Sequence, residues 1–300
     1  MSTKAVPIRA LRDLVRDGDT VALGGAWLSN RPMAAVRELV RAGRRNLHAV
    51  SVVGSIDVDL LVAAGAVDRL TFSMVSLEAF GLAPNFRRAA EAGTLQLTEM
   101  TGLSLEIGIE AAARGLPWLP YLGLGRPPAS ELVEINPGTF GEVRCPFSGE
   151  ILPVVKACKP DVAIVHVQRC DEHGNGQVDG TFGLDQELVA AASRVIVTCE
   201  ELVPRRVVTA SPHMTTIPGF LVTAVIEAPF GAHPTSHVPL YSLDGMAMLE
   251  YTSVAASDDF PAYLGQLRAE DEADYRARNV NPQRARVLNA LVHAASPLVG

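Results

Sequence analysis

Features that assign a chain to a special structural class are scarce in this sequence. Its 300 residues include 4 cysteines, none in a C-x-x-C spacing. A chain of this length buries roughly 75% of its unfolded surface without covalent staples, so scattered cysteines indicate reduced thiols and a cytoplasmic protein. The first residues lack the apolar segment of a signal peptide, and no apolar run approaches the roughly 18 residues of a membrane span. We therefore expect no membrane segment.

Positive charge is also in short supply. The 26 Lys and Arg residues are outnumbered by 33 Asp and Glu residues, and the net charge is −7. Non-specific nucleic-acid binding depends on neutralising phosphates, so we predict no nucleic-acid partner. The hydrophobic content of 48% excludes a disordered chain.

Several catalytic signatures are missing. There is no P-loop, no G-x-S-x-G and no H-E-x-x-H motif, which removes support for nucleotide phosphoryl transfer, α/β-hydrolase chemistry and zincin chemistry. Gly123 and Gly125 lack the third glycine of a dinucleotide-binding loop, because Pro128 occupies its position. We predict no bound metal.

Strand-like and helix-like segments alternate along the chain. Continuous apolar runs, typical of strands covered on both faces, are followed by segments with helical spacing of apolar residues. This rhythm predicts an α/β fold with an open, mainly parallel sheet and helices on both faces. Strands are expected at 20–25, 47–53, 70–75, 95–98, 161–167 and 194–199, and helices at 33–40, 60–64, 86–92, 105–114 and 184–192.

The chain is predicted to form one domain over residues 1–300, with its core at about 8–240. Residues 241–300 are predicted to be a peripheral, mostly helical segment. The stretch 123–150 is rich in Pro and Gly, which is typical of a functional loop or an edge. At the first long helix, Ser29 and Asn30 offer N-cap chemistry before Pro32, and Gly43 ends the helix.

The turn Gly24-Gly25-Ala26 lies between a predicted strand and a predicted helix. Glycine there permits a positive φ and a close approach of ligand to backbone. The helix that follows is expected to present free N–H groups to an anion or an acyl oxygen. A tight turn without a ligand is the alternative. Gly54 and Ser55 form the corresponding turn after the next strand.

Carboxylates follow two further strands. Ligands of open α/β sheets bind outside the carboxyl ends of the strands, and Glu78, with Ser76 beside it, follows the strand at 70–75. Glu78 is either a substrate-facing acid or a solvated loop acid, and the sequence leaves both interpretations open. Glu99 ends a strand, and Glu106 is expected to open a helix, where its charge complements the helix dipole.

Two histidines and one acidic turn also invite a chemical interpretation. His233 and His237 are four residues apart, but Pro234 opposes a helix that would align them on a metal. A packing or capping role is therefore favoured. Asp171, Glu172 and His173 precede Gly-Asn-Gly, which favours a surface turn over an acid–base pair.

An ordered set of segments resembles the α subunit of class I coenzyme A transferases, of the glutaconate CoA-transferase type. No single segment decides this, but the set spans roughly residues 18–240 in the family's order. The segments are Thr20-Val-Ala-Leu-Gly-Gly, Arg31-Pro-Met-Ala-Ala-Val, Ala113-Arg-Gly-Leu-Pro-Trp-Leu-Pro, Cys145-Pro-Phe-Ser-Gly-Glu, Asp161-Val-Ala-Ile-Val-His-Val, Ile196-Val-Thr-Cys-Glu-Glu, Ile217-Pro-Gly-Phe and Glu227-Ala-Pro-Phe-Gly-Ala-His-Pro.

The resemblance implies a CoA-transferase-like fold, an acyl-CoA thioester as substrate, and no permanently bound cofactor. It also implies a β-type partner chain in an α2β2 heterotetramer, with the active site between the chains. A glutamate of the β chain attacks the thioester and, through an anhydride, becomes a glutamyl-CoA thioester that passes CoA to a carboxylate. This chain then supplies the acyl- and CoA-binding residues. These are Gly24, Gly25, Ala26, Gly54, Ser55 and Ser76, with Glu78 as the catalytic candidate.

Two departures from the family pattern concern the acyl group. The family's Gly-Gly-Phe reads Gly24-Gly25-Ala26 here, which implies a reshaped acyl pocket. A substrate-contacting serine of the family falls near Ser76–Glu78, with Glu78 at the nominal position. A carboxylate there repels a dicarboxylate unless it is protonated or paired.

Relatives on the same fold leave alternatives open. The chain is alternatively the α subunit of a CoA-thioester hydrolase, a ring-cleaving hydrolase or a decarboxylase, or a non-catalytic acyl-CoA-binding or assembly subunit. The ring-cleaving hydrolases use an α-chain glutamate in the region just after the equivalent of Glu99-Met100. This region reads Thr101-Gly102-Leu103 here, which argues against that activity.

Overall fold

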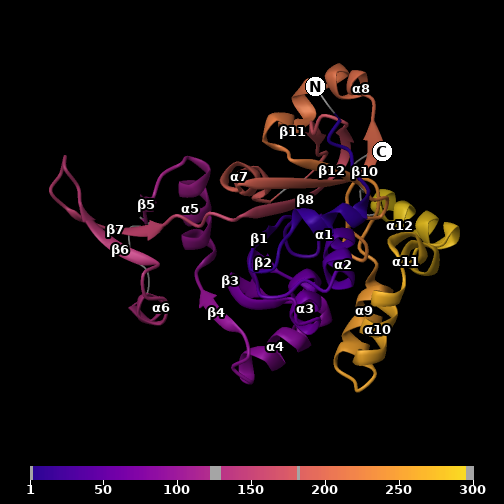
Figure 1. The fold of residues 1–300 in the computed structure, drawn as a ribbon, viewed down its shortest axis with the longest axis horizontal. Helices are drawn as coiled ribbons and strands as arrows, with labels where there is room; N and C mark the ends of the chain where they lie inside the picture. The colour runs from indigo at the N-terminus through magenta and orange to yellow at the C-terminus, as the bar shows by residue number, and fades with distance from the viewer. Residues whose placement is uncertain (1–2, 122–129, 181–182, 295–300) are drawn as a thin grey trace.

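A computed structural model describes residues 3–121, 130–180 and 183–294. Its centre is a nine-stranded sheet of β1 (Thr20–Leu23), β2 (Leu47–Gly54), β3 (Val67–Val75), β4 (Gln96–Glu99), β8 (Val162–Asp171), β9 (Gly176–Gln177), β10 (Arg194–Val203), β11 (Thr215–Ile217) and β12 (Ala224–Glu227). Strands β12, β10, β8, β1, β2, β3 and β4 lie side by side in this order and run parallel (Figure 1). The short β9 pairs antiparallel with the end of β8 and with β11. The expected mainly parallel sheet is confirmed.

Helices cover both faces of the sheet because the strands bury side chains on both sides. In β1, Val21 and Leu23 face one apolar cluster, whereas Ala22 faces another, as the two-residue period of a strand requires. The first cluster is covered by α2 (Met33–Arg41), α3 (Ile56–Ala63) and α4 (Pro84–Glu91), and the second by α5 (Gly102–Ala113) and α7 (Asp185–Ala191). The shorter helices are η1 (Ile8–Ala10), α1 (Leu11–Leu14), η2 (Glu78–Phe80), α8 (Arg205–Ala210), η4 (Pro212–Met214) and η5 (Gly219–Leu221).

The start of α2 differs from the sequence-based expectation. The helix begins at Met33 after Pro32, and no side chain caps it, so the N-cap prediction for Ser29 and Asn30 is wrong. Ser29 instead closes a turn, in which its N–H donates to the Ala26 carbonyl oxygen at 2.9 Å. The predicted end is confirmed, because Gly43 follows the helix with φ +65°.

Two other helices start earlier than predicted. Helix α3 begins at Ile56, directly after β2, rather than at residue 60. Helix α5 begins at Gly102, and the Thr101 hydroxyl caps it by accepting the Ser104 N–H. Glu106 therefore lies beyond the first turn, and its predicted role at the helix N-terminus is wrong.

A three-stranded antiparallel sheet projects from the body as an arm (Figure 1). It consists of β5 (Trp118–Pro120), β6 (Phe140–Arg144) and β7 (Ile151–Lys156), in the order β5-β7-β6, and α6 (Ser130–Ile135) precedes β6. From residue 140 on, the Pro/Gly-rich stretch is therefore an edge hairpin. Residues 122–129, with Gly123, Gly125 and Pro128, lie outside the described ranges.

The C-terminal part of the described chain is helical, with α9 (Gly245–Ala255), α10 (Phe260–Ala269), α11 (Glu272–Asn279) and α12 (Pro282–Ala294). Met248, Tyr251, Leu264 and Leu267 are buried in the same apolar cluster as α2 and α3. Helices α9 and α10 are thus part of the core rather than its periphery. The assignment of the chain to one domain stays a prediction. Within the described ranges, no helix combines the length and the apolarity that crossing a lipid bilayer requires.

Candidate active site

The order of the strands reverses its direction between β1 and β8. From β1 the chain moves outward through β2, β3 and β4, and from β8 it moves the opposite way through β10 and β12. In open α/β sheets, ligands bind outside the carboxyl ends of the strands at such a switch point. The turn at Gly24 and Gly25 follows β1 directly and therefore lies at this point.

The sequence-predicted site residues lie along this same edge of the sheet. Strand β2 pairs with β3 up to Gly54 and Val75, and the Ser76 N–H donates to the Gly54 carbonyl oxygen at 3.0 Å. The Glu78 N–H in turn donates to Ser76 Oγ at 3.0 Å. The edge thus carries Gly24, Gly25, Ala26, Gly54, Ser55, Ser76 and Glu78 at the ends of three neighbouring strands.

The N–H groups of the glycine turn are already occupied. Those of Gly24, Gly25 and Ala26 donate to Ile164 O at 2.9 Å, Asp185 Oδ1 at 2.7 Å and Ser29 O at 3.0 Å. At the start of α2, the N–H of Ala34 donates to Gly231 O. The expectation of free N–H groups at the start of this helix is therefore wrong for Met33 and Ala34, whose N–H groups donate to Arg31 O and Gly231 O.

Both glycines are required by the turn itself. Gly25 has φ +76°, and a Cβ there would lie 2.6 Å from the carbonyl oxygens of Ser29 and Asn30. A Cβ on Gly24 would lie 2.6 Å from Asp185 Oδ1. Local packing thus accounts for both glycines. This agrees with the alternative interpretation, in which the turn is tight and binds no ligand.

Backbone strain is concentrated at this edge. Among the described non-glycine residues, five have a positive φ: Trp27, Asn30, Asn46, Glu78 and Phe230. All except Asn46 follow the carboxyl end of β1, β3 or β12. Non-glycine residues in this region are uncommon, and such conformations cluster at functional sites, where the surrounding structure holds them. This concentration supports a functional edge independently of the sequence motifs.

A buried ion pair anchors the loop after β1. Arg31 is 1% exposed, and its Nη1 lies 3.2 Å from Asp57 Oδ2. Its Nε donates to Trp27 O at 2.9 Å, and Nη1 donates to Gly24 O at 3.3 Å. Removing one partner of such a pair leaves an uncompensated buried charge, so Arg31 and Asp57 fix the loop that carries the two glycines.

A cluster of potential metal ligands lies behind the turn. His166 on β8, Glu200 on β10 and His237 place ligand-type atoms within 4.8 Å of one another. A carboxylate offers about four lone-pair sites, and Glu200 accepts from four donors, three on Oε1 and one on Oε2. The donors are His166 Nε2 at 2.8 Å, the N–H groups of Phe230 at 2.6 Å and Gly231 at 3.1 Å, and the Tyr241 hydroxyl. A metal bound through Glu200 Oε1 would have to displace three of these donors, so we interpret the cluster as a hydrogen-bond network.

His237 links this network to the loop after β1. Its Nδ1 lies 2.7 Å from Asn30 Oδ1, and its ring centroid lies 4.5 Å from that of His166. Burial lowers the pKa of His237 well below its usual range, so the ring is neutral and Nδ1 carries the donated hydrogen. His237 therefore stabilises Asn30 in its positive-φ conformation.

The other sequence-predicted polar groups have structural roles elsewhere. His233 contacts Tyr275 Oη and Asp244 Oδ2, each at 3.0 Å, so it does not converge with His237. Asp171 accepts the N–H groups of His173 and Asn175, each at 2.9 Å, which makes the acidic segment the turn that its glycines favoured.

Comparison with known proteins identifies the family. Residues 5–228 match the family model for coenzyme A transferase. One of the subunits of 3-oxoadipate CoA-transferase from Pseudomonas knackmussii is 32% identical, over 90% of this chain and 95% of the relative. The IpdA subunit of a cholesterol ring-cleaving hydrolase from Mycobacterium tuberculosis is 31% identical, over 89% of this chain and 95% of the relative. The chain spans 55% of the length of a relative from Archaeoglobus fulgidus.

Solved structures agree with the sequence matches. Glutaconate coenzyme A-transferase from Acidaminococcus fermentans superimposes with a TM-score of 0.89 at 29% identity, over 95% of each chain. A variant of the decarboxylase AibA/AibB superimposes with a TM-score of 0.80 at 32% identity, over 90% of this chain and 100% of that one.

This chain belongs to the coenzyme A transferase family. The resemblance inferred from the ordered segments is confirmed, and so are the CoA-transferase-like fold and the enzyme class, a CoA transferase of the α-subunit type. The family acts on CoA thioesters. Sequence reasoning missed Arg31, Asp57 and Asp185, although Arg31 lies inside one of the segments that carried the resemblance.

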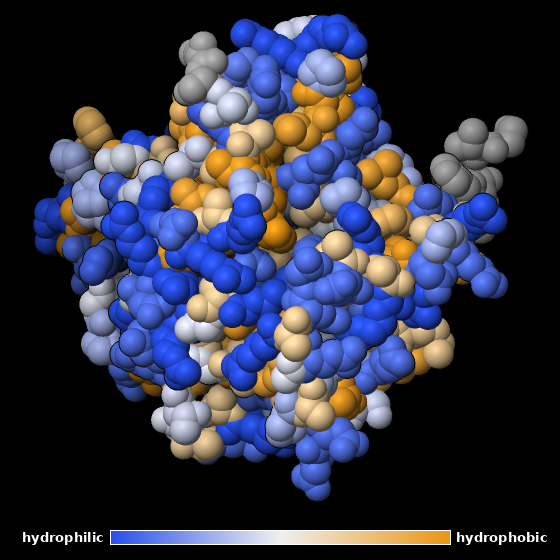
Figure 2. Space-filling model, turned by 45° about the vertical axis from the view of Figure 1, so that its right-hand side comes forward, coloured by the Kyte–Doolittle hydropathy of each residue, from blue (hydrophilic) through white to orange (hydrophobic). Residues whose placement is uncertain are grey.

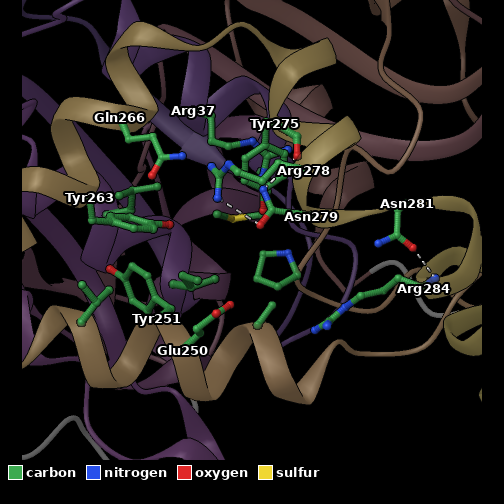
Figure 3. A pocket seen from close by; sticks show the side chains of 16 residues that line it. Arg37, Glu250, Tyr251, Tyr263, Gln266, Tyr275, Arg278, Asn279, Asn281 and Arg284 are labelled. Atoms are coloured by element: carbon green, nitrogen blue, oxygen red, sulfur yellow. Dashed lines mark hydrogen bonds between the residues drawn. The ribbon is translucent and has the colours of Figure 1, made fainter.

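This CoA-transferase chain also contains a cavity of about 520 Å³ between α2, α3 and the C-terminal helices. In Figure 3 the side chains of Tyr263 and Gln266 from α10 and of Glu250 from α9 point toward it. Its guanidinium groups are each paired with a carboxylate of the chain: Arg37 with Glu272, Arg278 with Glu270, and Arg284 with Asp244. Because those charges are neutralised internally, the cavity is a weaker candidate than the switch point.

Proposed function

We propose that this chain is the α subunit of a heteromeric enzyme that moves CoA between an acyl-CoA and a carboxylic acid. The observation that carries the proposal is the glycine turn at the switch point of a fold that glutaconate CoA-transferase matches over 95% of its chain. CoA enters as the thioester substrate, and no permanently bound cofactor is required.

The nucleophile belongs to a β-type partner in this proposal. Among the described residues of the edge, the side chain of Glu78 is exposed and the carboxyls of Asp57 and Asp185 are buried. The buried pair holds the loop and the turn, which leaves them unsuited to attack a thioester. The partner's glutamate forms an acyl anhydride and expels the CoA thiolate, which returns to give glutamyl-CoA and a free carboxylate. The acceptor carboxylate then reverses these steps.

Exposed apolar side chains around the edge support the partner. Trp27 is 50% exposed in the loop after β1, and Met246 and Leu249 of α9 are 66% and 53% exposed. Val238 and Leu240 add to this surface from the loop that carries His237. Figure 2 shows hydrophobic residues at the surface between hydrophilic ones on one side of the molecule. Obligate interfaces are apolar like a divided core, so we propose that the partner covers this edge in an α2β2 assembly in the cytoplasm.

The acyl site is formed by the sequence-predicted residues in this proposal. Gly24, Gly25 and Ala26 form its floor, and Gly54, Ser55 and Ser76 line the neighbouring strand ends. Glu78 orients the substrate at the mouth. No ion pair to the Glu78 carboxylate is found within the described part of the chain, so a dicarboxylate such as glutaconate would meet an uncompensated negative charge. We therefore propose acyl groups without a second carboxylate.

A hydrolase or decarboxylase acting on a CoA thioester is the second candidate. The similarity to the decarboxylase AibA/AibB and to the IpdA subunit favours it. Thr101 caps α5 and Gly102 and Leu103 follow, so the position expected to carry the glutamate of ring-cleaving hydrolases offers no acid.

The experiment compares transfer with breakdown in the complex of this chain with its native partner. We expect acyl-CoA to be consumed only when a carboxylic acid is added, with one new acyl-CoA formed per acyl-CoA consumed. Each chain alone should be inactive. Free CoA released without a new thioester, or loss of CO2 from the acyl group, would favour the second candidate.

A further inference from the structure

A buried acid lies directly beneath the glycine turn. Asp185, the first residue of α7, is 1% exposed. Its Oδ1 accepts the Gly25 N–H at 2.7 Å. Within the described ranges, its Oδ2 has no hydrogen-bond partner, which is rare for a buried carboxyl oxygen. The acid touches Gly24 so closely that a Cβ on that residue would lie 2.6 Å from Oδ1.

The charge of this carboxyl is poorly compensated. Arg31, from the loop after β1, is the cation that acts on it, and the nearest carboxylate oxygen to Arg31 belongs to Asp57. Glu187, two residues further along α7, adds a like charge. Among the described residues, no charged side chain of the neighbouring α5, β8 or β11 acts on Asp185. Burial therefore dominates and raises the pKa of Asp185 to about 7.

The two protonation states of Asp185 differ in what they do to an anion at the turn. Either state accepts the Gly25 N–H through Oδ1, so both hold the peptide that joins Gly24 to Gly25. Only the ionised state places an uncompensated negative charge beneath the turn, in a region of low dielectric where like charges repel strongly.

We propose that Asp185 is a positioning residue of the acyl site, which holds Gly25 and must be uncharged when a carboxylate approaches the turn. The proposal rests on the proposed function, because that reaction brings a carboxylate acceptor to the turn. The pH profile of CoA transfer then falls at alkaline pH because of a group on this chain, and not because of the partner's nucleophile. Above neutrality, ionised Asp185 lowers the affinity for the acceptor and raises its KM.

The test is the pH dependence of kcat/KM for the acceptor carboxylate in the complex with the native partner. In the wild type we expect kcat/KM to fall about tenfold per pH unit above about pH 7, through KM rather than kcat. Asp185→Asn keeps an oxygen that accepts the Gly25 N–H but carries no charge, so its kcat/KM should stay at the low-pH value through pH 9. The matched control Glu187→Gln removes a charge from the same helix and should keep a basic limb, displaced only slightly to lower pH because the Glu187 charge helps to raise the pKa of Asp185.

An unchanged basic limb in Asp185→Asn would overturn the proposal, and so would a fall that resides entirely in kcat. A second measurement needs only this chain. Its infrared spectrum should show a protonated carboxyl band that disappears as the pH rises through 7 and is missing in Asp185→Asn. Absence of that band from the wild type at pH 6 would also overturn the proposal. A wild-type complex that transfers no CoA would instead contradict the proposed function, while the infrared result would still report on Asp185.

Discussion

Two carboxylates at the carboxyl edge of the sheet differ in their surroundings, and this difference determines what each is suited to do. Asp185 is enclosed and holds a backbone N–H. The side chain of Glu78 is exposed, on a residue with φ +54°. Burial raises the pKa of an enclosed acid, so its charge depends on pH near neutrality. An exposed acid is instead accessible to a substrate.

Substitution of Glu78 separates an orienting role from a proton-transfer role. In the complex, Glu78→Gln should change kcat less than about tenfold and should raise kcat/KM for acyl groups with a second carboxylate, because the repelling charge is removed. The matched control Glu99→Gln, at the exposed end of β4, should change neither. A loss of about 10²–10⁴ in kcat with an unchanged KM, the usual share of general acid–base catalysis, would contradict the orienting role.

Substitution of Asp185 also has a consequence for stability. The pKa of this carboxyl is about 7 in the folded chain, against an ordinary 3.8, so the folded state holds a proton that the unfolded state releases. Stability is then lost as pH rises between about 4 and 7, by an amount on the order of 4 kcal/mol. Asp185→Asn should remove this loss and become more stable than the wild type at pH 8, as urea unfolding at several pH values would measure. Parallel stability curves for the two proteins would contradict the assignment.

The Asp185 and Arg31 contacts explain what sequence reasoning missed at this scale. The exposed or loop-borne candidates Ser76 and Glu78 follow a strand end that the hydrophobic pattern reveals. Asp185 accepts the Gly25 N–H, and Arg31 donates to the Gly24 carbonyl oxygen. Asp185 lies 160 positions from Gly25 along the chain. No local pattern marks such a buried polar residue, because its role depends on which loops meet at the edge.

At the scale of elements, the glycine turn is a structural unit whose sequence is set by its own packing. Gly25→Ala places a Cβ against two carbonyl oxygens at φ +76°. The matched control Gly43→Ala has φ +65° but an open surrounding. We expect a loss of stability of roughly 1 kcal/mol for Gly43→Ala and at least about 3 kcal/mol for Gly25→Ala, where strain and collision add, measured by urea unfolding. Equal losses would show that the turn around Gly25 relaxes without cost.

The strand and helix pattern of the body follows from the sequence because its strands are continuous apolar runs between glycine-rich turns. Element boundaries are less well predicted. Ser29 and Asn30 have the chemistry of an N-cap, yet Pro32 precedes the helix, and Ala34 donates its N–H to Gly231 O. The hairpin of β6 and β7 was hidden by its proline and glycine content. In both places tertiary contacts, or an edge position, override the local signal.

At the scale of the whole molecule, the edge that carries the candidate site is also rich in exposed apolar side chains. Trp27 lies in the loop after β1, Met246 lies on α9, which contacts η2, and Phe147 at the tip of the arm is 96% exposed. Exposed apolar patches of this kind mark interaction sites. The chain therefore has the surface of a protein that works in a complex, as the proposed function requires.

The position of the covalent intermediate distinguishes a nucleophile on the partner from one on this chain. The complex of this chain with its native partner is incubated with an acyl-CoA in the absence of acceptor, and the intact masses of both chains are measured. We expect a mass increase equal to that of CoA, less one water, on a glutamate of the partner and no change on this chain. A CoA adduct on this chain, for example on Glu78, would contradict its assignment as an α chain whose nucleophile lies on its partner.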